Sequence, residues 1–311
     1  MPCCKKTSIG GQAVIEGIVM KGPEKTALAT RMKDGSIDVE YMPFKALKDK
    51  PKIFRVPVFR GVLAFVDAMI QGYKALMLSA DKSGYLEEEE TDKKPSNTLV
   101  SVIMTLGTVL GIALAVVLFM WIPAALFNLF NSAVGGNADG FRSLFEGVIK
   151  IAVFVIYMFA VSFMKDIQRV FEYHGAEHKT IFAYEAGLEL NVENCRKMKR
   201  FHPRCGTSFL ILMLLVNIIV TGLISTFLPA LTANTAVWVA VKIVLLPLIC
   251  GLGYELIRIN GRFDNVITRI LSAPGMWLQR ISTKEPDDSM LEVAIAAMTA
   301  VIPEDSEADK W

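Results

Sequence analysis

The three histidines of this 311-residue chain all lie within residues 172–209. Two of them enclose a glutamate in the pattern H-x-x-E-H, and the third precedes a cysteine in the pattern H-x-x-C. Imidazole nitrogen and thiolate sulfur are ligands that zinc prefers in proteins, and the first pattern occurs in metal-dependent hydrolases. The stretch therefore predicts a divalent-metal site, most simply for zinc, with the candidate ligands His174, His178, His202 and Cys205.

The first two ligands are expected on a helix. Nothing in the sequence breaks a helix between residues 144 and 186, and Gly187 is a typical C-terminal stop, so we expect one continuous helix there. His174 and His178 are four residues apart and would share one face. Glu177 lies beside that face, where it would serve as the catalytic general base. Glu185, further along the same face, is an additional candidate ligand or a partner of a ligand.

Two interpretations of the site stay open at this point. If all four candidate ligands bind, the site is closed and structural; if only three bind, a fourth position stays open for water and Glu177 has a catalytic role. Glu255, at the end of the last apolar block, is a further candidate ligand. Glu16, which lies among apolar neighbours, is expected to be an exposed strand residue.

The composition indicates a membrane protein. Hydrophobic residues make up 53% of the chain, charged residues make up 21%, and the mean hydropathy is +0.42. Such values are typical of apolar spans embedded in an otherwise polar chain. Five cysteines without regular spacing argue against a disulfide framework and for a reducing compartment. The first residues lack an apolar region, so we expect no cleaved signal peptide, and we expect no nucleic-acid partner.

Four blocks are long and apolar enough to cross the bilayer: residues 99–130, 144–164, 207–228 and 237–257. The segment between the second and third blocks carries eight lysines and arginines, whereas the segment between the third and fourth carries none. The excess of positive charge predicts that both termini and the histidine stretch are cytoplasmic. We therefore expect a multi-pass protein of the cytoplasmic (inner) membrane.

The predicted fold class is mainly α, with about four transmembrane helices, a small N-terminal β-containing cytoplasmic module and amphipathic helices. Its parts are an N-terminal module (1–95), spans one and two (96–165), the metal-site loop (166–206), spans three and four (207–258) and an amphipathic tail (259–311).

Local signals add detail to the two ends of the chain. Asp34-Gly35 predicts a β-hairpin, and Gly10-Gly11-Gln12 is interpreted as a turn. Residues 60–80 predict an amphipathic helix on the membrane face or packed on another helix, and residues 263–281 an amphipathic segment at the interface. Residues 286–289 are expected to open a short apolar helix over residues 291–302. The acidic and basic run at residues 87–94 is interpreted as a solvated linker, and residues 304–311 as a disordered end.

The chain resembles the YqhQ-like family of bacterial membrane proteins, which are described as predicted metal-dependent enzymes. The resemblance extends from about residue 7 to 302 and rests on GGQAVIEGIVMKGP (10–23), RG (60–61), SA (79–80), HGAEHKTI (174–181), HPRCGTSF (202–209) and YELIR (254–258). It implies a membrane protein with a metal and no defined substrate. Because Glu16 and Glu255 fall inside these motifs, the resemblance also makes them candidates for lining the site.

Three functions fit these observations. The first is a metal-dependent hydrolase acting on a lipid-linked or peptide substrate at the surface of the lipid bilayer. The second is a non-enzymatic scaffold or regulator, in which the metal clamps spans two and three together. The third is a transporter that uses Lys242 and Glu255 within the membrane, for which four spans would require a homo-oligomer.

Overall fold

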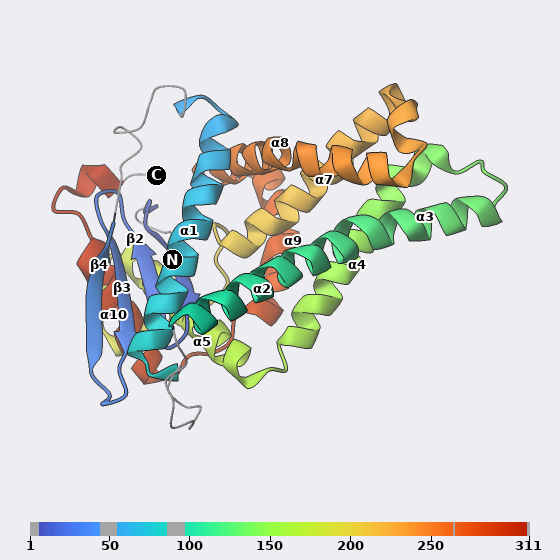
Figure 1. Ribbon diagram of the computed structural model, residues 1–311. Helices are drawn as coiled ribbons and strands as arrows, with labels where there is room; N and C mark the ends of the chain where they lie inside the picture. Colours follow the sequence, from blue (N-terminus) through green and yellow to red (C-terminus); the bar gives the residue numbers. More distant parts are fainter. Residues whose placement is uncertain (1–5, 44–54, 86–96, 264, 310–311) are drawn as a thin grey trace.

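The computed structural model describes residues 6–43, 55–85, 97–263 and 265–309, so the charged run at 87–94 lies outside the described residues. The N-terminal part is a four-stranded antiparallel sheet in the order β1-β2-β3-β4 (Figure 1). The strands span Gly10–Val14, Gly17–Lys21, Thr26–Arg31 and Ile37–Met42.

One of the two turn predictions is confirmed. Asp34-Gly35 connects β3 to β4, and Gly35 takes a positive φ of 84°. The turn predicted at residues 10–12 is wrong, because these residues form β1. The turn instead follows β1, where Glu16 has a φ of 49°, so Glu16 is a turn residue and not a strand residue.

Helices cover both faces of the sheet because its side chains alternate between two apolar sets. On one face, Val14, Val19 and Leu28 pack with Ala75 of α1 (Phe59–Lys82). On the other face, Ile18, Met20, Ala27 and Ala29 pack with α5 (Lys165–Glu185) and α10 (Asp288–Val301). The predicted short helix near the C-terminus is α10, and Asp287 caps its N-terminus.

The end of the chain is tied to this layer, so the prediction of a disordered end at residues 304–311 is wrong for its described part. Ser306–Asp309 forms a 3-10 turn. The buried Asp309 carboxylate accepts hydrogen bonds from Thr7 Oγ1 (2.6 Å) and Tyr184 Oη (2.9 Å). These partners are distant in the sequence, which is why the local composition did not reveal them.

The apolar part of the protein is a group of long helices. They are α2 (Asn97–Val116), a π-helical turn (Val117–Trp121), α3 (Ile122–Ala133), α4 (Arg142–Val161), α7 (Gly206–Phe227) and α8 (Thr235–Arg262). Short 3-10 turns at Asp139–Phe141 and Pro229–Thr232 and a short helix α6 (Val192–Arg196) complete the connections. The π-helical turn directly precedes Pro123, whose ring cannot donate a helical hydrogen bond.

Five helices among the described residues are long and apolar enough to cross a membrane. Four correspond to the predicted spans and the fifth is α1, so the expected number of about four is not confirmed by this criterion. Length and composition are those of a multi-pass membrane protein. Helix α1 runs at a steep angle to α8 (Figure 1).

The single helix predicted over residues 144–186 is wrong. Helix α4 ends at Val161, Met164 is extended (φ −73°, ψ 129°), and α5 begins at Lys165. No glycine or proline marks this break. Its physical reason is tertiary: α5 turns away from the apolar bundle to bury Tyr173, Ala176 and Ala183 against the sheet and α10.

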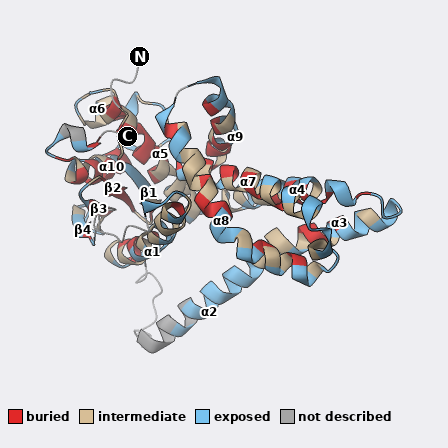
Figure 2. Ribbon diagram, turned by 90° about the horizontal axis from the view of Figure 1, so that it is seen from above, coloured by how far each residue is buried: buried red, intermediate tan, exposed pale blue. Residues whose placement is uncertain are grey.

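The bundle buries several ionisable side chains, whereas many side chains on its exposed outer faces are apolar; Figure 2 shows which faces are exposed. The buried Glu146 carboxylate of α4 accepts hydrogen bonds from Arg142 Nε (3.0 Å), from Trp238 Nε1 (3.1 Å) and from Lys242 Nζ. One turn further along α4, Lys150 Nζ donates to Asn217 Oδ1 (2.7 Å). Ionisable groups inside a membrane bundle are expected to face inward and to pair in this way.

Helix α9 (Val266–Ser282) confirms the predicted amphipathic helix. Its polar face is buried and its apolar face is exposed, which is the reverse of an amphipathic helix in a soluble protein. It buries small and polar residues against α7 and α8, including Ser272, Gly275 and Gln279. It exposes Val266, Ile267, Ile270 and Trp277, each more than 60% accessible. The apolar face is thus turned outward, as expected for a helix that lies on a bilayer.

The hydrogen bonds that Glu146 accepts from Arg142, Trp238 and Lys242 predict that one isosteric change lowers the stability of the protein strongly. Glu146→Gln removes the carboxylate and leaves the buried Arg142 and Lys242 without it, which is expected to cost about 3–5 kcal/mol of stability. Thermal unfolding in nanodiscs should show a clearly lowered midpoint. Glu193→Gln, which removes one exposed partner of Lys197, should leave the midpoint unchanged. An unchanged midpoint in Glu146→Gln would contradict the role assigned to this network.

Candidate metal centre

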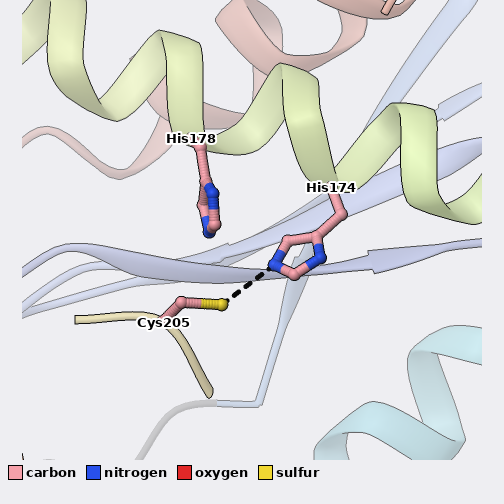
Figure 3. A group of neighbouring side chains, drawn as sticks. All are labelled: His174, His178 and Cys205. Atoms are coloured by element: carbon pink, nitrogen blue, oxygen red, sulfur yellow. Dashed lines mark hydrogen bonds between the residues drawn. The ribbon is translucent and has the colours of Figure 1, made fainter. Parts of the chain in front are cut away.

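Three candidate ligands converge at the junction of the sheet layer and the apolar bundle. His174 and His178 lie one turn apart on α5, and Cys205 is the N-cap residue of α7. One ligand atom of each lies within 4.8 Å of the others, and His174 Nε2 is 3.1 Å from Cys205 Sγ (Figure 3). His178 is 1% exposed and Cys205 is 7% exposed.

Two backbone carbonyls orient the imidazole rings. His174 Nδ1 donates to Ser282 O (2.8 Å), and His178 Nδ1 donates to Arg200 O. Because a carbonyl can only accept, each Nδ1 carries the proton and each Nε2 is the atom left to bind a metal. Gly175 lets the segment after α9 approach this closely, since a Cβ there would lie 2.0 Å from Lys284 O.

Two further hydrogen bonds hold the turn that carries Cys205. The buried Gln279 side chain of α9 accepts a hydrogen bond from His202 N and donates one to His202 O, both at 2.8 Å. The turn and α5 are therefore fixed to the same helix, α9. Neither Gln279 nor Ser282 was identified from the sequence, because nothing local in α9 distinguishes them from other polar residues of an amphipathic helix.

The charges of Cys205 and His174 stabilise each other, and His178 lies beside them. Burial alone would raise the pKa of Cys205, but the neighbouring His174 and His178 hold it well below its usual range. Burial alone would lower the pKa of His174, but the Cys205 thiolate raises it to about 9. At neutral pH the cluster without a metal thus contains a thiolate and an imidazolium.

Glu177 lies beside the cluster, and only one of its two carboxylate oxygens accepts a hydrogen bond from the described residues. Its Oε1 accepts a hydrogen bond from Gly11 N (3.1 Å), which is a contact between β1 and α5. Its Oε2 is buried and has no hydrogen-bond partner among the described residues. Burial raises the pKa of this carboxyl. Gly11 is required for the approach, because a Cβ there would lie 3.0 Å from Glu177 Cδ.

The fourth candidate ligand, His202, is near the cluster but outside the group of three. Its ring centre is 5.6 Å from that of His178. Its Nδ1 accepts a hydrogen bond from Arg204 N (3.3 Å), so the neutral ring carries its proton on Nε2, which lies 3.6 Å from Glu185 Oε2. Burial lowers the pKa of His202 to about 4. The ring is thus neutral and directed toward a carboxylate.

The three additional carboxylates are each engaged by an arginine. Glu185 pairs with Arg204, Glu255 with Arg60, and Glu16 with Arg169. Burial would raise the pKa of Glu185, but the His202 ring and the Arg204 charge outweigh it and lower the pKa to about 2. The structure does not bring these carboxylates into the group formed by His174, His178 and Cys205.

A cavity of about 760 Å³ adjoins the cluster. Its walls come from β1, β2, the start of β3, α1, α5, α8 and the turn before α7, and its lining includes Gly11, Arg60, Glu177, His178 and Cys205. The Gly-Gly-Gln stretch of β1 is therefore part of the site. The two consecutive glycines mark this stretch in the sequence, but the local pattern could not assign it to a strand beside the histidines.

Comparison with known proteins identifies the family. The profile of the family described as "Protein of unknown function (DUF1385)" matches residues 56–304. The protein described as "Uncharacterized protein YqhQ" from Bacillus subtilis (strain 168) is 31% identical over 303 residues, which cover 94% of this chain and 92% of that protein. The chain belongs to the YqhQ-like family. No solved structure matches.

The electrostatics of the cluster predict a thiolate at neutral pH in chelator-treated protein. Because the pKa of Cys205 is lowered, its thiolate should persist as the pH falls to 7 and below. The thiolate absorbance near 240 nm, taken as the difference between wild type and Cys205→Ser, measures it. In His174→Gln the imidazolium is lost, the pKa of the buried thiol rises, and the band should disappear at pH 7. A wild type without the band at pH 7 would contradict this electrostatic account.

Proposed function

We propose that this protein is a metal-dependent hydrolase of the cytoplasmic membrane, with its site on the cytoplasmic face. The observation that carries the proposal is the combination of three convergent ligand atoms with the uncommitted Glu177 Oε2 beside them, at the wall of a cavity. A site with three protein ligands leaves a coordination position open, which is the arrangement of catalytic zinc sites.

The donor set supports zinc as the ion. Two imidazoles and one thiolate match the ligands of catalytic zinc sites and differ from the oxygen ligands preferred by calcium and magnesium. A bound ion would supply a Lewis acid that polarises a carbonyl group of the substrate and acidifies water. The hydrogen bonds from Nδ1 of His174 and His178 would keep both rings aimed at it.

The roles of the other residues follow from their contacts. Glu177 would take a proton from the attacking water on Oε2, while the Gly11 N–H holds Oε1 in place. Burial raises the pKa of this carboxyl, and a carboxylate with a raised pKa accepts a proton more readily. His202, paired with Glu185, would position the turn that carries Cys205 and would not bind the ion.

The proposed topology has four spans, formed by α2 with α3, by α4, by α7 and by α8. Helix α1 meets the criteria for a span but runs across α8 and packs its later half on the sheet, so we assign it to the membrane surface together with α9. The excess of lysine and arginine between α4 and α7 supports a cytoplasmic location for the metal centre and for both termini.

The alternative is a structural metal that clamps α5 to the start of α7. The near-complete burial of His178 and Cys205 favours it, because closed structural sites exclude solvent. The two functions differ in what Glu177 does. A clamp has no use for its second oxygen, whereas the hydrolase requires it.

Metal analysis tests the ligand set. Purified full-length protein should contain about one zinc ion per chain by mass spectrometry. The ion should be lost in His178→Ala and Cys205→Ser and retained in His202→Gln. Loss of zinc in His202→Gln would support four ligands and a closed site, and wild-type protein that takes up no zinc would refute both the hydrolase and the clamp.

Isotope incorporation tests the reaction. Zinc-loaded protein in nanodiscs of bacterial lipid, incubated in ¹⁸O-water with β-casein, should release labelled carboxylates from either the lipid or the casein. Glu177→Gln should retain zinc and the thermal midpoint but react about 10²–10⁴-fold more slowly, the usual contribution of a general base. If the wild type releases no labelled product, or if Glu177→Gln is as active as wild type, the proposed catalytic role fails.

A further inference from the structure

Helix α9 has two opposite faces that differ in chemistry. The buried face follows the helical spacing and consists of Thr268, Ser272, Gly275, Gln279 and Ser282. The opposite face is exposed, and its residues Val266, Ile270 and Trp277 are 71%, 65% and 69% accessible. A contiguous apolar face of this kind is unfavourable in water and marks a surface that a partner covers.

The buried face fixes α9 beside the ends of two apolar helices. Gly275 packs on Ser208 in the first turn of α7, where a Cβ on the glycine would lie 2.4 Å from Ser208 Oγ. Asn260, near the end of α8, donates to Ser272 Oγ. Helix α9 also begins only four positions after the last residue of α8. In the proposed topology α7 and α8 are spans, so α9 lies next to the bilayer surface.

Basic side chains accompany the exposed face. Residues 258–284 contain four arginines and one lysine but only one acidic residue. Arg262, Arg269 and Arg280 are exposed, and the Arg280 guanidinium lies 5.0 Å from the centre of the Trp277 ring. An apolar stripe flanked by arginine and ending in tryptophan suits a surface of acyl chains covered by anionic headgroups.

The buried face of the same helix holds the candidate metal centre. Ser282 O accepts a hydrogen bond from His174 Nδ1 at 2.8 Å. The Gln279 side chain makes two hydrogen bonds of 2.8 Å to the backbone of His202. A displacement of α9 would therefore release both the histidine helix α5 and the turn before α7.

We propose that the exposed face of α9 docks on an anionic phospholipid surface and that this docking keeps the metal-ligand residues in place. On the bilayer, Val266, Ile270 and Trp277 leave water while α9 keeps its position. Without the bilayer, the hydrophobic effect favours any displacement of α9 that covers these residues, and the bonds from Gln279 and Ser282 are lost with it. The consequence for metal binding rests on the proposed function, whereas the docking and the order of the turn do not.

Fluorescence quenching tests the docking. The full-length protein is placed in nanodiscs whose phospholipids carry a nitroxide at the headgroup end of the acyl chain. The emission of wild type minus that of Trp277→Phe isolates Trp277, and this component should be quenched by the lipid nitroxide and protected from iodide in the water. A Trp277 component that the lipid nitroxide leaves unchanged, whether open to iodide or shielded by a protein partner, overturns the inference.

Hydrogen exchange of zinc-free protein tests the link to the site. The His202 amide donates to Gln279 Oε1, so its protection reports whether α9 is in place. Its exchange should be roughly tenfold slower in an equal mixture of phosphatidylglycerol and phosphatidylcholine than in phosphatidylcholine alone, because basic side chains add to the attraction. The double variant Arg262→Gln and Arg280→Gln should abolish this difference.

Two further variants serve as controls. The double variant Lys25→Gln and Lys197→Gln removes the same charge from exposed positions outside α9 and should keep the lipid difference. Trp277→Glu alters only an exposed side chain and should speed exchange of the His202 amide in the mixed lipid. Each variant is first checked for an unchanged thermal midpoint.

The outcomes separate the inference from the proposed hydrolase. Exchange of the His202 amide that depends on neither the lipid nor the α9 variants overturns the inference, even if the protein binds zinc and is active. Lipid-dependent exchange together with quenching of Trp277, in a protein that takes up no zinc, would support the inference and refute the proposed function.

Discussion

The geometry of the candidate metal centre depends on two hydrogen bonds to backbone carbonyls. By fixing the proton of His174 and of His178 on Nδ1, Ser282 O and Arg200 O leave both Nε2 atoms directed toward Cys205. Ser282 is the last residue of α9, and Arg200 lies in the segment that precedes α7, so the ligand geometry depends on how α5, α7 and α9 pack together. The clamp from Gln279 onto the backbone of His202 serves the same end.

The arrangement also joins two environments. The sheet with α1, α5 and α10 has an apolar interior, as in a soluble domain. The helices α4, α7 and α8 instead bury Glu146, Lys242 and Lys150 and expose apolar side chains, which is favourable in a bilayer. Helices α1 and α9 lie where the two meet, and the candidate centre lies between them and the sheet. The candidate site therefore adjoins both environments.

The sequence predicted those parts of the structure that local spacing controls. The four-residue spacing of His174 and His178 implied a shared helix face, Asp34-Gly35 implied a hairpin, and the apolar blocks implied the long helices. The remaining features depend on contacts between residues far apart in the sequence. The break at Met164 arises because α5 packs on the sheet, and the Gly-Gly-Gln stretch is a strand because Gly11 must approach both Val19 and Glu177.

The carboxylates illustrate the same limit. Glu16, Glu185 and Glu255 have the chemistry of ligands, and spacing alone could not exclude them. Each instead pairs with an arginine, and two of these partners, Arg169 for Glu16 and Arg60 for Glu255, are more than 150 positions away. His202 was similarly ambiguous until the hydrogen bond from Arg204 N showed which of its nitrogens carries the proton. His202 thus lies outside the group of three convergent ligand atoms, which is the arrangement that the proposed open site requires.

X-ray absorption spectroscopy at the zinc edge tests this central claim most directly. The account predicts one sulfur ligand at about 2.3 Å, two imidazole nitrogens at about 2.0–2.1 Å and one further light atom that is not an imidazole. The further ligand should remain in His202→Gln. A spectrum that requires three imidazoles and one sulfur in the wild type, and that loses one imidazole in His202→Gln, would contradict an open site and with it the proposed catalysis.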